Sequence, residues 1–330
     1  MKAAAIHRYK QPVAIVDLTK PSPGPGDLLV KMRAASVNPL DFKIRDGGVK
    51  ALISYSFPLI LGNDLAGEVE AVGEGVTRFH PGDAIYARLD KHRIGAFAEY
   101  ALVSEGAAAA KPKNLDWAEA ASLPLVGLTA WQALIDVGGL KPAQKVLIHA
   151  GAGGVGTFAI QLAKHLGATV TTTASARHHD LVRSLGADVL VDYKTTRFDD
   201  VVRDQDMVFD TQGGDTLLRS FTCVKPDGLV VTVGGVPDAK FARAWGLRPP
   251  IQWALAFMTR KVTRLAKQRP ARFEYWFMRA SGEQLAAIAK LVENGVIKPV
   301  VDKKYPLDAA PEALAYVESG RAVGKVVVEA

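Results

Sequence analysis

The spacing of apolar and polar positions changes along the chain, and the change predicts two kinds of structure. Short apolar or alternating runs occupy the first third, and turn sequences such as PSPGPGD, VGEGV and HPGD separate them. Short runs bounded by Gly and Pro are typical of β-strands. We expect strands at 1–6, 27–35, 67–72, 83–88 and 96–102, followed by helices at 116–121 and 126–137.

Beyond Gly139, short apolar runs alternate with segments of helical periodicity. The sequence predicts strands at KVLIHA, ATVTTTAS, DVLVDY, DMVFDT and GLVVTVGG, with helices at 154–166 and 176–185 among them. This alternation indicates a parallel sheet with crossover helices, an α/β fold with a doubly wound (Rossmann) sheet. The chain then ends in a helix at 282–294 and a strand, GKVVVEA. We place the inserted α/β domain at 125–265, within a β-rich domain formed by 1–124 and 266–330.

Composition agrees with an ordinary globular protein of two domains. The chain has 330 residues, of which 48% are apolar and 23% charged. No apolar run approaches the roughly 20 residues of a membrane span, and the N-terminus does not resemble a signal peptide. Cys223 is the only cysteine, which excludes an intrachain disulfide and any multi-cysteine metal site. We expect a cytoplasmic protein in which Cys223 and His149 are packed in the interior.

The positive charge is concentrated in one segment. Residues 239–273 contain nine basic residues and no acidic one, and the net charge of +7 falls to −2 when those nine charges are left out. This pattern does not indicate a general nucleic-acid-binding chain. The segment, with apolar residues such as Trp253 and Phe257 among its bases, either covers a cleft or a subunit contact with a solvated basic face, or makes weak contact with an anionic membrane surface through 240–272.

The sequence VLIHAGAGGVG carries the strongest chemical signal. Residues 151–156, GAGGVG, match the pattern G-x-G-x-x-G between a predicted strand and a predicted helix, which is the context that the dinucleotide-binding motif requires. Backbone N–H groups at the start of the helix attract a pyrophosphate, and side chains at the glycines would hold it away. The alternative, a tight turn without a ligand, is less consistent with the flanking elements.

The identity of the dinucleotide follows from the end of the next strand. An NAD site places a carboxylate about 20 residues after the glycines, but the segment TTTASARHH contains none. It offers the hydroxyl of Ser175 and the guanidinium of Arg177, which can bind a 2′-phosphate. The cofactor predicted is therefore NADPH. Ser175 could instead serve only as the N-cap of the following helix.

Four segments together resemble a known family. AGAGGVG after a strand, SVNPLDFKIRDG near the N-terminus, LPLVGLTAW before the inserted domain and GK near the C-terminus are similar to the medium-chain dehydrogenase/reductase superfamily over nearly the whole chain. The resemblance is closest to its zinc-independent branch, the quinone oxidoreductases and enone reductases. It implies that the β-rich domain is GroES-like and that the protein is a monomer or a homodimer.

The resemblance also implies roles for individual residues. Asn38 would face the nicotinamide and the substrate carbonyl, and Thr129 would contact the nicotinamide region, so these two are the candidate catalytic residues. Tyr193 would help to hold the 2′-phosphate, and Lys325 would lie near the cofactor. The candidate cofactor-binding residues are Gly151, Gly153, Gly154, Val155, Gly156, Ser175, Arg177, Tyr193, Gly234 and Lys325.

The residues that hold zinc in the other branch are replaced here. Asn38 stands where that branch has a catalytic cysteine, Gly62-Asn63-Asp64 stands in place of Gly-His-Glu, and the chain passes from Tyr86 to Phe97 without the four-cysteine lobe. Zinc takes thiolate, imidazole or carboxylate ligands. We therefore expect no metal site, and we expect Asp41 and Asp64 to hold loops by hydrogen bonds.

The absence of those ligands narrows the expected chemistry. Zinc usually stabilises the alkoxide in alcohol oxidation, whereas a quinone or an α,β-unsaturated carbonyl can accept hydride directly from NADPH. We expect a metal-independent reductase of quinones, enals or enones, with a small-molecule substrate and no nucleic-acid partner. No residue stands out as a general acid, so the proton could come from water. Two alternatives remain: a zinc-free alcohol or polyol dehydrogenase, and a non-catalytic NADPH-binding sensor or scaffold protein.

Overall fold

The computed structural model describes residues 1–330 and divides into two compact units. Unit 1 comprises Met1–Leu128 and Arg279–Ala330, and unit 2 comprises Thr129–Met278. The second boundary lies beyond the expected residue 265 because strand β14 (Arg272–Tyr275) pairs with β13 and remains part of the parallel sheet. No helix is both long enough and apolar enough to cross a bilayer.

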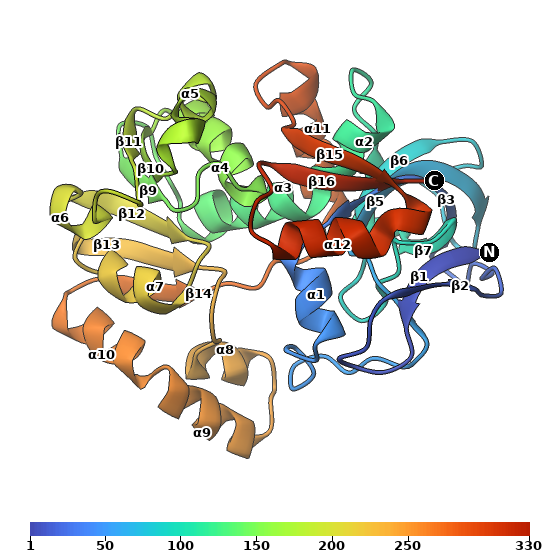
Figure 1. Ribbon diagram of the computed structural model, residues 1–330, viewed down its shortest axis with the longest axis horizontal. Coiled ribbons are helices and arrows are strands. Elements are labelled where there is room, and N and C mark those ends of the chain that lie inside the picture. Colours follow the sequence, from blue (N-terminus) through green and yellow to red (C-terminus); the bar gives the residue numbers. More distant parts are fainter. The chain divides into compact units, whose positions relative to one another are not determined.

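Unit 1 is built on two β-sheets (Figure 1). A seven-stranded sheet has the order β15-β16-β3-β5-β6-β8, with β7 also paired to β3, and a smaller sheet has the order β2-β1-β4. The strands are β1 (Lys2–Ile6), β2 (Ala14–Asp17), β3 (Asp27–Val37), β4 (Leu59–Ile60), β5 (Asp64–Val72), β6 (Ala84–Arg88), β7 (Tyr100–Ser104), β8 (Ala108–Ala110), β15 (Val301–Pro306) and β16 (Lys325–Glu329). β3 is central because it pairs with β5, β7 and β16.

Short helices cover the sheets of unit 1. They are α1 (Pro39–Arg45), α2 (Trp117–Ala121), α11 (Gly282–Glu293), α12 (Ala310–Glu318) and the 3₁₀ turns η1 (Glu105–Ala107) and η4 (Leu307–Ala309). The main core contains β3 residues such as Val30 and Met32 together with Leu65, Leu314 and Val328, which are all buried. Apolar side chains from both segments of the chain therefore share one core.

The first helix near the unit boundary differs from the expected span of 126–137. α3 (Pro124–Trp131) begins at the proline and continues into a π-helix at Gln132–Val137. Proline lacks the backbone N–H that would in any case have no partner in the first turn, so it begins this helix rather than preceding it.

Unit 2 is a six-stranded parallel sheet with the order β11-β10-β9-β12-β13-β14. This is the order of a doubly wound dinucleotide-binding fold. The strands are β9 (Lys145–Ile148), β10 (Thr169–Thr173), β11 (Val189–Val191), β12 (Gln205–Asp210), β13 (Val224–Thr232) and β14. The helices are α4 (Gly154–His165), η3 (Ala176–His178), α5 (His179–Ser184), α6 (Phe198–Val201), α7 (Gly214–Ser220), α8 (Ala239–Ala244), α9 (Pro249–Met258) and α10 (Arg260–Gln268).

Candidate active site

The glycine turn follows β9, which is an inner strand of the parallel sheet of unit 2 (Figure 1). β9 lies between β10 and β12, and the strand order reverses on either side of it. Residues 151–156 follow β9 and lead into α4, so the turn is at the carboxyl edge of the sheet. In doubly wound sheets, this reversal point is where ligands bind.

The three motif glycines have different surroundings. A Cβ added at Gly151 would lie 2.2 Å from Thr172 Oγ1, and one at Gly156 would lie 2.3 Å from the Ala150 carbonyl oxygen. These two glycines are therefore required by the packing of strand, turn and helix. A Cβ at Gly153 would meet only the Ala150 oxygen, at 3.3 Å. Apart from this backbone oxygen, no protein atom lies within 4 Å of that position, so the space beside Gly153 can admit a ligand.

Helix α4 begins without a side-chain cap. Its N-cap is Gly153, and Gly154, Val155 and Gly156 form its first turn. The N–H groups of a first turn have no acceptor within the helix, and the helix dipole adds positive potential at the same end. A pyrophosphate would accept hydrogen bonds from these N–H groups, and the dipole would attract its negative charge. These residues therefore fit the dinucleotide that the sequence predicts.

Ser175, Arg177 and Tyr193 lie at the same edge because they follow two neighbouring parallel strands. β10 and β11 are paired through Thr173 and Val191, the last residues of each strand. Ser175 is buried, and its side chain makes no capping hydrogen bond to η3. The alternative that Ser175 serves as a helix cap is therefore not supported.

Arg177 presents an exposed guanidinium with no ion-pair partner. Its Nε donates to His178 Nε2 at 2.9 Å, and the terminal amino groups remain for an anion. The side chain of Tyr193 is 60% exposed in the turn after β11. The geometry is compatible with a 2′-phosphate held by Ser175 and Arg177.

Asp210, which the sequence analysis did not single out, connects two loops at the same edge. Its carboxylate accepts from Thr232 Oγ1 at 2.7 Å, from Gln212 N at 3.0 Å and from Gly213 N at 2.9 Å. Burial raises the pKa of Asp210 and these donors oppose the shift. A Cβ at Gly234 would lie 2.8 Å from Gly213 N, so the loops after β12 and β13 are in direct contact. The sequence feature that could have identified Asp210 is a carboxylate at the end of the predicted strand DMVFDT.

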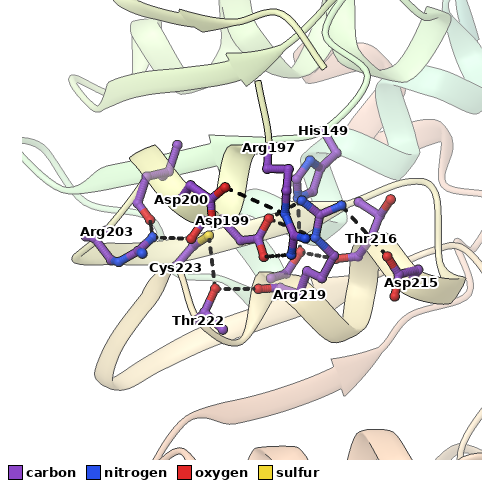
Figure 2. A network of polar contacts seen from close by, with 12 residues as sticks. His149, Arg197, Asp199, Asp200, Arg203, Asp215, Thr216, Arg219, Thr222 and Cys223 are labelled. Carbon is purple, nitrogen blue, oxygen red and sulfur yellow. Dashed lines mark hydrogen bonds and ion pairs between the residues drawn. The ribbon is translucent and has the colours of Figure 1, made fainter. Parts of the chain in front are cut away.

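His149, the buried residue that follows β9, belongs to the network of polar contacts in Figure 2. Ser220 Oγ donates to the Thr216 carbonyl at 2.8 Å, so its 3.0 Å contact with His149 requires the proton on Nε2. Nδ1 then accepts from Thr173 Oγ1 at 3.3 Å, and that oxygen accepts from Ala150 N at 3.0 Å. The imidazole thereby holds the start of the glycine turn.

This network is structural. Burial lowers the pKa of His149 to about 3, and the charge of Arg219 acts in the same direction, so the ring is neutral. Arg219 pairs with Asp199 and lies 4.7 Å above the Phe198 ring. Cys223 is fully buried, and burial raises the pKa of its thiol. The expectation that His149 and Cys223 are packed interior residues is confirmed.

Asn38, in unit 1, is held by side chains from distant parts of the chain. It is 1% exposed, and its Nδ2 donates to Asp64 Oδ1 at 2.9 Å and to the Ser36 carbonyl at 3.1 Å. Its Oδ1 accepts from Lys325 Nζ, which fixes the orientation of the amide. Both amide hydrogens are therefore used within the protein. That Asn38 faces the nicotinamide and the substrate carbonyl stays a prediction.

Lys325 is the cation that contacts Asn38 in this cluster. It is 5% exposed, and its ammonium donates to Asn38 Oδ1 and to the Val37 carbonyl, the latter at 3.1 Å. Its third N–H has no acceptor in the protein. Burial lowers the pKa of Lys325, while the charges of Asp64 and Asp41 oppose the shift. The cluster thus contains a buried ammonium with one hydrogen free for another acceptor.

Asp41 holds the backbone around this cluster. It accepts from Asn38 N at 2.7 Å, from Gly62 N at 3.2 Å and from Asn63 Nδ2 at 2.7 Å. Burial raises the pKa of Asp41 to about 7, against the effect of donors from Asn38 and Asn63. Asp64 accepts from Leu125 N at 3.0 Å. The expectation that these two carboxylates hold loops is confirmed.

The donor set of the cluster does not fit a zinc ion. Zinc sites use three or four thiolate, imidazole or carboxylate ligands, and no group of three or more His, Cys, Asp or Glu residues in the structure could hold a metal. Here the side chain next to Asn38 is a lysine whose ammonium donates toward it. A second cation would be repelled by Lys325.

Thr129, the other candidate catalytic residue, is buried in α3 at the start of unit 2.

Comparison with known proteins agrees with both units. Residues 24–113 match the family model described as "Alcohol dehydrogenase GroES-like domain", and residues 185–328 match "Zinc-binding dehydrogenase". The chain is 35% identical over 319 residues to the chloroplastic quinone-oxidoreductase QR1 of Triphysaria versicolor. The matched region covers 95% of this chain and 93% of that protein.

A second relative and a solved structure point to the same family. The chain is 36% identical over 311 residues to 2-methylene-furan-3-one reductase of Solanum lycopersicum, covering 91% of this chain and 71% of that protein. The structure of Escherichia coli quinone oxidoreductase complexed with NADPH superposes with a TM-score of 0.85 at 26% identity, over the full length of both chains. The chain therefore belongs to the medium-chain dehydrogenase/reductase superfamily, with quinone oxidoreductases among its structural neighbours.

Proposed function

We propose that the protein is an NADPH-dependent oxidoreductase that transfers hydride to quinones or to α,β-unsaturated carbonyl compounds without a metal ion. The observation that carries the proposal is the contact of the buried Lys325 ammonium with Asn38, at the position where the zinc-dependent branch has a metal ligand. The names of two relatives, a quinone oxidoreductase and an enone reductase, support the substrate class.

The residues of unit 2 supply binding and orientation. NADPH, when bound, supplies the hydride. The N–H groups at the start of α4 hold its pyrophosphate, and Ser175 and Arg177 bind its 2′-phosphate. His149 contributes indirectly. It contacts the Thr173 hydroxyl, which accepts a hydrogen bond from the Ala150 N–H at the start of the glycine turn. These contacts fix the cofactor before the reaction, which lowers the entropic part of the barrier.

The residues of unit 1 supply electrostatic stabilisation. Hydride addition to a quinone or an enone places negative charge on the carbonyl oxygen, and a fixed positive charge lowers the energy of that state. The Lys325 ammonium carries this charge, and Asn38 and the Val37 carbonyl hold it in place. Lys325 thus provides the charge that zinc provides in metal-dependent dehydrogenases.

A substrate panel tests the proposal. Purified protein should consume NADPH, followed by the absorbance of reduced nicotinamide, with quinones and with enals or enones, and it should not oxidise simple alcohols in the presence of NADP⁺. If NADPH binds but no quinone, enal or enone is reduced, the protein is a sensor or scaffold and the proposal is wrong. Oxidation of alcohols alone would identify a dehydrogenase instead.

The preference for NADPH over NADH should depend on Arg177. The exposed guanidinium offers two parallel hydrogen bonds to a phosphate, so Arg177→Ala is expected to lower the ratio of kcat/KM values for NADPH and NADH by about 10- to 100-fold. Arg183→Ala is the matched control because Arg183 is also exposed and pairs only with Asp180. An unchanged ratio in Arg177→Ala would remove this residue from the site.

A further inference from the structure

Helix α9 has an apolar sequence but no buried residue. Nine of its ten residues, PPIQWALAFM, are apolar, and Trp253, Phe257 and Met258 are 73%, 65% and 60% exposed. Pro250, Trp253, Ala254 and Phe257 are spaced to share one face, and all four are exposed. Single exposed apolar residues are ordinary, whereas a contiguous patch of this kind marks a surface that another body covers.

Helix α10 fixes a row of basic residues beside this face. Its apolar residues Val262 and Leu265 pack against the core of unit 2, while Lys261, Arg264 and Lys267 are exposed. α10 lies against α7, and α9 lies against α8, so both helices are attached to unit 2 (Figure 1). The packing of the apolar residues of α10 against unit 2 therefore holds the three basic side chains on the solvent-exposed side of the helix.

The positive charge of the segment is not compensated. Of the nine basic residues in 239–273, only Lys240 pairs with a carboxylate, that of Glu274. Arg260 instead lies 3.8 Å above the Phe257 ring, where it joins the basic row to the apolar face. The remainder of the chain has a net charge of −2. The segment is therefore a local cationic surface next to exposed aromatic rings.

We propose that α9 and α10 form a docking surface for an anionic phospholipid membrane. Trp and Phe side chains insert at the boundary between headgroups and acyl chains, and Lys and Arg residues bind the lipid phosphates. A nucleic acid would leave the apolar face of α9 without a partner. A second copy of the chain packed face to face through a two-fold axis would bring the two basic rows together. This inference does not depend on the proposed activity.

Vesicle sedimentation tests the proposal with the full-length protein. The protein should sediment with vesicles containing about one third phosphatidylglycerol in phosphatidylcholine, should not sediment with phosphatidylcholine alone, and should be released at high salt. Lys261→Glu/Arg264→Glu should lower the partition coefficient at least about tenfold, since it replaces two positive charges near the membrane surface by negative ones. Trp253→Ala/Phe257→Ala should lower it as well.

The matched control keeps the same change in net charge. Lys43→Glu/Lys290→Glu alters two exposed helical lysines in unit 1 and should retain vesicle binding. Equal loss in this control would show that net charge alone is responsible, and failure of the wild-type protein to sediment would also overturn the proposal. So would light scattering that shows a dimer which Trp253→Ala/Phe257→Ala dissociates, because the face would then be covered by a second copy.

Discussion

Replacing Lys325 by methionine is expected to lower kcat for quinone reduction by about 10²- to 10³-fold, the effect of removing one preorganised electrostatic donor. Methionine preserves the unbranched apolar stem but removes the ammonium that contacts Asn38. The variant should also be less stable, because the charge of Lys325 interacts favourably with the buried Asp64 carboxylate. Kinetics and thermal unfolding of the same variant measure both effects.

Lys325→Arg distinguishes electrostatic action from a purely structural role. Burial lowers the pKa of Lys325, and the ammonium must be protonated to act. Activity of the wild-type protein should therefore decline as pH rises, at a lower pH than an ordinary lysine would give. Arginine does not deprotonate in this range, so the variant should retain its activity at high pH. A Lys325→Met protein with wild-type kcat would show that the ammonium only holds the loop.

Replacing Gly153 by alanine is expected to raise the Kd of NADPH by about 100-fold, since a new methyl group would occupy the space of a closely packed pyrophosphate. The stability of the protein should fall only slightly, because Gly153 has an extended backbone (φ −82°, ψ 169°) that alanine adopts, and its one close contact, with the Ala150 oxygen at 3.3 Å, needs a shift of a few tenths of an ångström. Calorimetric titration with NADPH and thermal unfolding together measure the two effects.

Gly106→Ala is the matched control for Gly153→Ala. Nothing lies within 4 Å of a Cβ at Gly106, so both NADPH binding and stability should remain as in the wild type. Unchanged affinity in Gly153→Ala would mean that the pyrophosphate does not lie against this turn.

The sequence predicted unit 2 well because its elements repeat a regular pattern. The strand, glycine turn and helix at 146–166 were expected and are observed as β9, the turn and α4.

The strands of unit 1 that the pattern missed, such as Ala14–Asp17 and Ala108–Ala110, have only four and three residues. Short edge strands show too few alternating positions to be distinguished from loops.

The polar cluster of unit 1 could be predicted only in part. The resemblance selected Asn38 and Lys325 separately, but 287 positions separate them, and no sequence spacing shows that they are in contact. Arg88 was not singled out, although it is fully buried and donates to Asn63. Contacts of this kind arise from the pairing of β3 with β5 and β16, which depends on the whole sheet.

We propose that a lysine, and no zinc ion, provides the positive charge when NADPH delivers hydride in this protein. The most direct test is the rate of NADPH oxidation by a quinone after chelation has removed zinc to below detection by mass spectrometry. We expect the full rate to be retained, and we expect added zinc not to increase it. Loss of activity on chelation, with recovery when zinc is restored, would show that zinc and not the lysine supplies the charge.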